Sequence, residues 1–223
     1  MPRLRIPGFG SWGEDPLWAT FYDWSVENPR FGRAIWKFGV GTSLDKLYAA
    51  AAEIGSLPAG SKVLDVPCGG GVATRGLKPG QNITYIAADI SQQMLDKTMA
   101  AARERGVADQ VHPQVSDVHN LHFADGEFDL VVSFTGLHCF PDPHQAIREI
   151  GRVLKPGGHL TGSTLLLDAS WRSKPMTVVG KRANLLGPGL TTTQLESWLA
   201  EAGLTSIKVD ISGAIGYFRA VRR

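Results

Sequence analysis

Cysteine is scarce in this chain of 223 residues. Its two cysteines, Cys68 and Cys139, stand far apart and form no Cys-x-x-Cys pair. That spacing excludes the common zinc and dithiol redox motifs, and it predicts two reduced thiols in a cytoplasmic protein. No cluster of acidic residues that could hold a metal ion can be assembled from the sequence, so we also expect no essential metal.

Long apolar runs and one-sided charge are missing as well. No stretch approaches the roughly 18 apolar residues of a membrane-spanning helix, and residues 1–8 lack the apolar centre of a signal peptide. The formal net charge is +2, and the basic residues are scattered along the chain. The sequence therefore predicts neither a membrane span nor a nucleic-acid partner, which would favour a basic stripe. It leaves the oligomeric state open.

Aromatic residues gather at one end of the chain. Four of the six tryptophans lie in residues 1–60, where Asp-Pro and Asn-Pro pairs indicate helix starts. We predict helices over 16–24, 30–38 and 43–53, which form a helical cap over a domain of residues 61–223. Aromatic side chains either pack such helices or line a pocket for an apolar ring or a sugar face. The candidate pocket residues are Trp12, Trp18, Tyr22, Trp24 and Trp36.

From residue 62 onward, strand and helix patterns alternate. Strands are predicted at 62–66, 83–88, 111–116, 128–134 and 159–167, and helices at 70–77, 91–105, 143–154 and 192–202. Such alternation predicts a parallel sheet with right-handed crossovers. Only three residues separate the last two strands, 206–211 and 215–221, which permits an antiparallel hairpin alone. The predicted fold is α/β: a three-layer, Rossmann-like, mostly parallel seven-stranded sheet with a C-terminal antiparallel hairpin and an N-terminal helical cap.

Five short motifs follow one another at the strand ends. They are the glycine-rich turn Val63–Gly71, Asp89, the pair Asp117-Val118, the strand Phe128–Ser133 and the turn Val153–Leu160. In this order, and with the hairpin, they resemble the class I S-adenosylmethionine-dependent methyltransferases of the small-molecule branch, over residues 60–222. The chain departs from the family at Pro67, where glycine is usual. Proline fixes φ and has no N–H to donate, so we expect cofactor binding with altered detail.

The resemblance implies S-adenosylmethionine as cofactor and a set of contacts to it. Asp65 would orient the turn and reach the methionine end through water, while Gly69 and Gly71 would let the backbone approach. Asp89 would bind both ribose hydroxyls, with Ser91 capping the next helix instead of Asp89. The remaining implied contacts are Ile90 and Met94 beside the adenine, Asp117 and the Val118 backbone at its amino group, and the backbone of Ser133 and Phe134.

His138 is the candidate general base. It follows the fourth strand, at the carboxyl edge where ligands bind in such sheets, and histidine has a suitable pKa. A hydroxyl acceptor would need such a base, although a neutral His138 packed beside the cofactor fits the sequence equally. His144 is a weaker candidate for substrate contact. These residues favour O-methylation of a small molecule.

Several alternatives remain at this stage. Methylation of carbon or nitrogen on a ring or quinone-like acceptor fits the same motifs. A nicotinamide-dependent oxidoreductase shares the glycine turn and the ribose acid, but the terminal hairpin and the lack of a Tyr-x-x-x-Lys pair disfavour it. A non-catalytic cofactor-binding protein is favoured only by Pro67.

Overall fold

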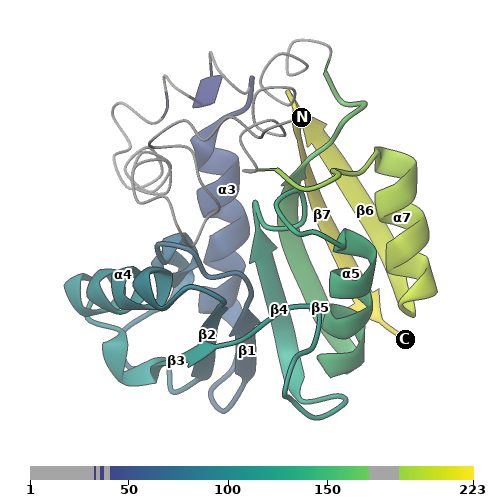
Figure 1. Cartoon of the computed structure of the whole chain (residues 1–223). Helices are drawn as coiled ribbons and strands as arrows, with labels where there is room; N and C mark the ends of the chain where they lie inside the picture. Colours follow the sequence, from purple (N-terminus) through teal and green to yellow (C-terminus); the bar gives the residue numbers. More distant parts are fainter. Residues whose placement is uncertain (1–32, 34–35, 38–40, 171–185) are drawn as a thin grey trace, which may run out of the picture.

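A seven-stranded sheet forms the middle of the molecule, in the order β3-β2-β1-β4-β5-β7-β6 (Figure 1). The computed structural model describes residues 33, 36–37, 41–170 and 186–223. Neighbours from β3 to β5 pair in parallel, whereas β7 pairs antiparallel with both β5 and β6. The predicted sheet and its hairpin are therefore confirmed. The strands are β1 (Lys62–Asp65), β2 (Thr84–Asp89), β3 (Val111–Val115), β4 (Phe128–Phe134), β5 (Leu154–Leu165), β6 (Leu204–Ser212) and β7 (Ile215–Arg222).

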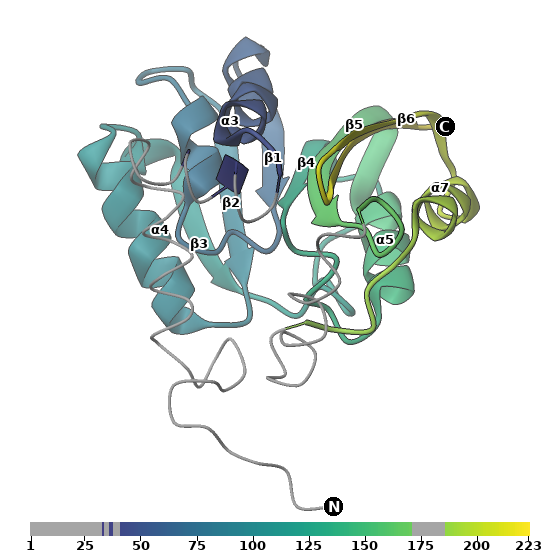
Figure 2. The same cartoon turned by 90° about the horizontal axis from the view of Figure 1, so that it is seen from above.

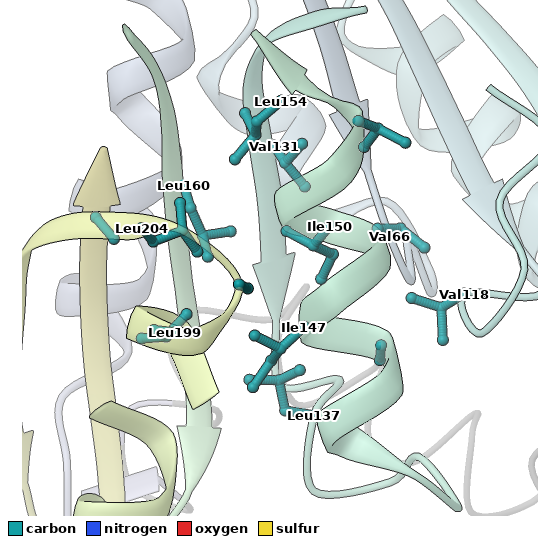
Figure 3. Close-up of a cluster of buried hydrophobic side chains, with 14 of the residues drawn as sticks. Val66, Val118, Val131, Leu137, Ile147, Ile150, Leu154, Leu160, Leu199 and Leu204 are labelled. Carbon is teal, nitrogen blue, oxygen red and sulfur yellow. The ribbon is translucent and has the colours of Figure 1, made fainter. Parts of the chain in front are cut away.

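Helices cover both faces of this sheet (Figure 2). On one face, α3 (Leu44–Ala51) and α4 (Gln92–Glu104) pack on the strands, and on the other α5 (Pro143–Val153) and α7 (Thr192–Glu201) do so. Figure 3 shows the hydrophobic cluster on this second face, in which side chains from α5 and α7 meet β4 and β5. The labelled members of this cluster include Val131, Leu137, Ile147, Ile150, Leu160 and Leu199. Burying each large aliphatic side chain contributes about 1.5–3 kcal/mol to the stability of the fold.

Local sequence explains where these two helices begin. The Asp142 carboxylate caps α5 by accepting from the backbone N–H of Gln145, and Pro143 occupies the first turn, which needs no N–H. α7 begins with a capping box, in which Thr191 and Gln194 each satisfy a backbone donor of the other. Within the described ranges, no helix has the length and apolar character to cross a bilayer.

Two predicted elements differ from the structure. The helix predicted at 70–77 is only a 3-10 helix over Val72–Gly76, because Gly71 precedes it with φ +87° and Leu77 returns to extended backbone. The strand predicted at 159–167 begins at Leu154 instead. Phe128 pairs with Leu154 and Leu130 with His159, so the residues between Leu154 and His159 loop out of the ladder.

Candidate functional site

The Asp89 carboxylate joins the glycine-rich turn to the end of β2, beside a backbone hydrogen bond from Cys68 to the Ala88 carbonyl at 2.9 Å. Asp89 Oδ2 accepts from the backbone N–H of Gly69 at 3.0 Å, and Oδ1 accepts from that of Ser91 at 3.0 Å. Ser91 stands at the N-cap of α4, but its side chain makes no capping hydrogen bond. Ser91 thus occupies the predicted N-cap position without a capping side chain, and Asp89 accepts from the N–H of Ser91 itself and not from a donor of the first turn. Both oxygens of Asp89 lie at the carboxyl edge of the sheet, where ligands bind in this architecture.

The two glycines of the turn have different tasks. A Cβ at Gly71 would lie 2.9 Å from Thr98 Cα, so the close packing of α4 by itself requires glycine at this position. Gly69 has φ +51°, and a Cβ there would meet open space. Its carbonyl is drawn back toward α4 by the hydroxyl of Thr98 at 2.8 Å. The open approach predicted for both glycines therefore belongs to Gly69.

Pro67 packs against the segment that follows β4. A Cβ at Gly136 would lie 2.3 Å from Pro67 Cδ, so only glycine fits opposite this proline. Thr135, the preceding residue, has φ +54°, which is uncommon for a β-branched side chain. Its backbone N–H donates to the carbonyl of Ser163 on β5 at 2.8 Å. The proline is thus accommodated by the residues after β4, and local backbone strain lies at the same edge as the turn.

Asp65 is buried below the turn and paired with a residue that sequence reasoning missed. The hydroxyl of Tyr85 donates to Asp65 Oδ2 at 2.6 Å, and the Asp65 side chain is almost fully buried. Burial raises the pKa of Asp65 to about 8, against the lowering effect of the Tyr85 hydrogen bond and with a further increase from Asp89. Asp65 is therefore protonated at neutral pH. Its carboxyl group supports the turn from inside and has almost no exposed surface, so the predicted contact with the methionine end through water stays a prediction.

The edge next to β2 and β3 offers an apolar surface and an acid. Ile90 is 68% exposed, which is unusual for isoleucine and suits a flat ring. Met94, predicted to flank the same ring, is buried on α4, and the Val118 side chain belongs to the core, so only its backbone can serve. Asp117 accepts from His119 through one oxygen, and hydrogen bonds from the His119 backbone and ring hold the pKa of Asp117 below its usual range.

Two buried hydroxyls at this edge lack a partner in the described part of the chain. They belong to Ser116, after β3, and to Ser133, near the end of β4. Such groups normally bond to protein, water or a ligand. Phe134 packs in the core, and its carbonyl accepts from the Thr135 hydroxyl at 2.7 Å. Together with the space at Gly69 and the exposed Ile90, these groups fit an adenosine-containing ligand.

His138 does not have the hydrogen bonding of a general base. Its Nδ1 accepts from the backbone N–H of Leu165 at 3.1 Å and lies 3.2 Å from the Thr164 hydroxyl. A backbone N–H can only donate, so the neutral ring carries its proton on Nε2. Burial also lowers the pKa of His138 to about 4. The neutral ring therefore has a donor and not an acceptor at Nε2, which disfavours the predicted base.

Other predicted acceptor residues lie elsewhere or outside the described ranges. The His144 ring stacks on Trp198 of α7 with centroids 5.1 Å apart, and its Nε2 lies 3.0 Å from a Glu201 oxygen. These contacts join α5 to α7 and give His144 a structural role. Trp36 is buried in the core beside α3. The other predicted pocket residues lie outside the described part of the chain: Trp12, Trp18, Tyr22 and Trp24. Among the described residues, no group of three histidine, cysteine or acidic side chains could hold a metal ion.

Comparison with known proteins identifies relatives of this chain that share the sequence forming the sheet and its carboxyl edge. Residues 64–161 match the protein family described as a methyltransferase domain. The 27-O-demethylrifamycin SV methyltransferase of Amycolatopsis mediterranei (strain S699) is 30% identical over 156 residues, which are 67% of this chain and 57% of that protein. The ubiquinone biosynthesis O-methyltransferase of Xanthomonas axonopodis pv. citri (strain 306) is 34% identical over 169 residues, 71% of this chain and 67% of that protein. The chain thus spans little more than half of the first relative.

A solved structure has the same fold. Phosphoethanolamine N-methyltransferase 2 of Haemonchus contortus, in complex with phosphomonomethylethanolamine and S-adenosylhomocysteine, superposes with a TM-score of 0.71. The match covers 92% of this chain and 56% of that chain at 17% identity. At this identity, the likeness concerns the fold alone.

Proposed function

Since the chain belongs to the class I S-adenosylmethionine-dependent methyltransferases, we propose that it transfers a methyl group from S-adenosylmethionine to a hydroxyl of a small molecule. The observation that carries the proposal is the Asp89 carboxylate, which bridges the open glycine turn and the end of β2. The relatives named above include two methyltransferases, one of them an O-methyltransferase, which supports a hydroxyl acceptor.

Different residues at the carboxyl edge of the sheet would bind different parts of the cofactor. When bound, the cofactor supplies a methyl group already activated on its sulfonium, so the protein mainly orients the reactants and excludes water. Asp89 would hold the ribose hydroxyls, Ile90 would cover the adenine ring and Asp117 would accept from its amino group. The helices predicted at 16–24 and 30–38 lie wholly or mostly outside the described residues, so a cap formed by residues 1–60 over the acceptor stays a prediction.

His138 would then serve as a hydrogen-bond donor through Nε2, not as a base. A donor can orient an acceptor oxygen but cannot remove its proton. The proposal therefore favours a phenolic or enolic hydroxyl, because a phenol has a pKa near 10 and ionises far more readily than an alcohol.

The protonation of His138 can be measured without knowing the acceptor. At pH 7 the ¹⁵N spectrum of the ring should show a proton on Nε2 and none on Nδ1. No titration should occur between about pH 5.5 and 8, because burial keeps the pKa low. The signal would be assigned by its loss in His138→Gln. A midpoint between about 6 and 7, or a proton on Nδ1, would restore the base role.

Calorimetric titration with S-adenosylhomocysteine, beside NADH and NADPH, tests the function itself. Micromolar binding of S-adenosylhomocysteine, with no binding of NADH or NADPH, would support the proposal. The next assay would measure the formation of S-adenosylhomocysteine from S-adenosylmethionine in the presence of phenolic and alcoholic acceptors. Binding of a nicotinamide instead would contradict it. Tight binding of the product with no turnover on any acceptor would favour a non-catalytic cofactor-binding protein.

A further inference from the structure

Asp117 is held in place by one neighbouring histidine. Its Oδ1 accepts from the backbone N–H of His119 at 2.9 Å and from Nδ1 of the same residue at 2.7 Å. Among the described residues, no hydrogen bond reaches the second carboxylate oxygen, Oδ2. Because both bonds converge on one oxygen, the carboxylate is oriented while its other oxygen is left for a ligand.

The far side of the same imidazole reaches the segment after β4. His119 Nε2 accepts from the backbone N–H of Asp142 at 3.4 Å, and the Gln145 amide donates to the His119 carbonyl at 3.2 Å. Since Nε2 accepts, the neutral ring carries its proton on Nδ1, which is the nitrogen that faces Asp117. The ring also meets Phe140 edge-on, with centroids 5.9 Å apart. One side chain thus joins the loop after β3 to the residues between His138 and α5.

The rest of that loop is anchored without His119. On the face of α5 that carries Gln145, Glu149 accepts from the backbone N–H of Leu121 at 2.9 Å. Arg152, one turn further along, donates to the carbonyls of Leu121 at 2.8 Å and Phe123 at 2.9 Å. Removing the imidazole should therefore leave the Asp117 carboxylate held by the backbone N–H of residue 119 alone, so that it is less well oriented, and should keep the loop and its core residues in place.

We propose that His119 is a positioning residue for cofactor recognition: it presents Asp117 to the exocyclic amino group of the adenine and links that contact to the segment carrying His138. This inference rests on the proposed function, because it needs a chain that binds an adenosine cofactor. His119 itself would not touch the cofactor. Its effect should therefore be confined to the discrimination of the adenine amino group.

The test compares two ligands that differ at that amino group. S-inosyl-L-homocysteine carries a carbonyl oxygen where S-adenosyl-L-homocysteine carries the amine, and a carboxylate repels the oxygen. Wild type should prefer the adenosyl ligand by about tenfold or more, and His119→Ala should reduce this preference to about threefold or less. His119→Asn, whose amide nitrogen replaces Nδ1, should keep most of the preference. His119→Gln, whose end group replaces Nε2, should lose it.

His122→Ala is the matched control, since it removes an exposed histidine from the same loop. Its preference should equal that of wild type, and thermal unfolding checks that each variant is folded. A wild-type chain that binds neither ligand would overturn the proposed function and this inference together. A wild-type preference that persists in His119→Ala would overturn the inference alone. A loss of preference in His119→Asn equal to that in His119→Ala would also contradict it.

Discussion

Replacing Asp89 by alanine should weaken binding of S-adenosylhomocysteine about 100-fold, or ~3 kcal/mol. Two effects add in this variant. The ribose hydroxyls lose a charged acceptor, and each such hydrogen bond contributes about 1.5–3 kcal/mol. In addition, the backbone N–H of Gly69 loses the carboxylate that accepts from it at 3.0 Å, so the glycine turn is less well ordered before the ligand arrives. Calorimetric titration measures the affinity directly.

Asp96→Ala is the control for this experiment. It removes the same charge from the exposed side of α4, where Asp96 accepts from the side chain of Gln92. Its affinity should stay within about twofold of wild type, as is usual for surface substitutions worth less than ~0.5 kcal/mol. An Asp89→Ala protein that is folded and binds with unchanged affinity would remove the observation on which the proposed function depends.

Much of the sheet could be predicted because its signals are local. Apolar runs and turn residues place β1, β2, β3 and β4 within one or two residues, and a short link, which is Gly213 and Ala214 in the structure, fixes the hairpin. The helix predicted at 70–77 lies in a segment with contacts that its own periodicity does not show. A Cβ on Gly76 would lie 1.9 Å from the carbonyl oxygen of Ala51, so only glycine fits where α3 meets this segment. Such contacts between distant residues leave no trace in local periodicity.

The site was predicted less fully, for a related reason. Asp89 and Asp117 follow strands and could be found from position alone. The proton of His138 depends on the Leu165 amide, which reaches it from a separate strand, so the sequence could not favour a donor over a base. Tyr85 did carry a signal: Val63 pairs with it, and Asp65 lies two residues further on the same face. A phenol in a buried strand needs a hydrogen-bond partner.

Asp65→Asn should make the fold more stable at neutral and alkaline pH. The carboxyl group has an ordinary pKa of 3.8, which burial raises to about 8 in the folded protein. Between these values the unfolded chain releases the proton while the folded chain keeps it, so stability falls as pH rises. Each pH unit in this window costs up to about 1.4 kcal/mol. Asparagine does not ionise, so the stability difference between variant and wild type should grow from about pH 4 to 8 and level off above.

Chemical denaturation across this pH range measures the effect, and Asp129→Asn provides a control of opposite sign. Although burial opposes it, hydrogen bonds from Lys155 and from the Lys62 backbone hold the pKa of Asp129 below its usual range. That carboxylate contributes stability above its unfolded pKa, so Asp129→Asn should be less stable than wild type at neutral pH. A stability difference for Asp65→Asn that does not change with pH would contradict the protonated, buried carboxyl.

A gain in stability on removing Asp65 would bear on function as well. Groups that destabilise a fold persist where activity requires them. Asp65 lies under the turn that would hold the cofactor, and the α-ammonium group of the ligand's amino-acid end would favour the ionised form of this carboxyl group, which burial disfavours. Asp65→Asn should then bind S-adenosylhomocysteine at least about tenfold more weakly while resisting denaturant better. A variant that gained stability and kept full affinity would instead make Asp65 a purely structural partner of Tyr85.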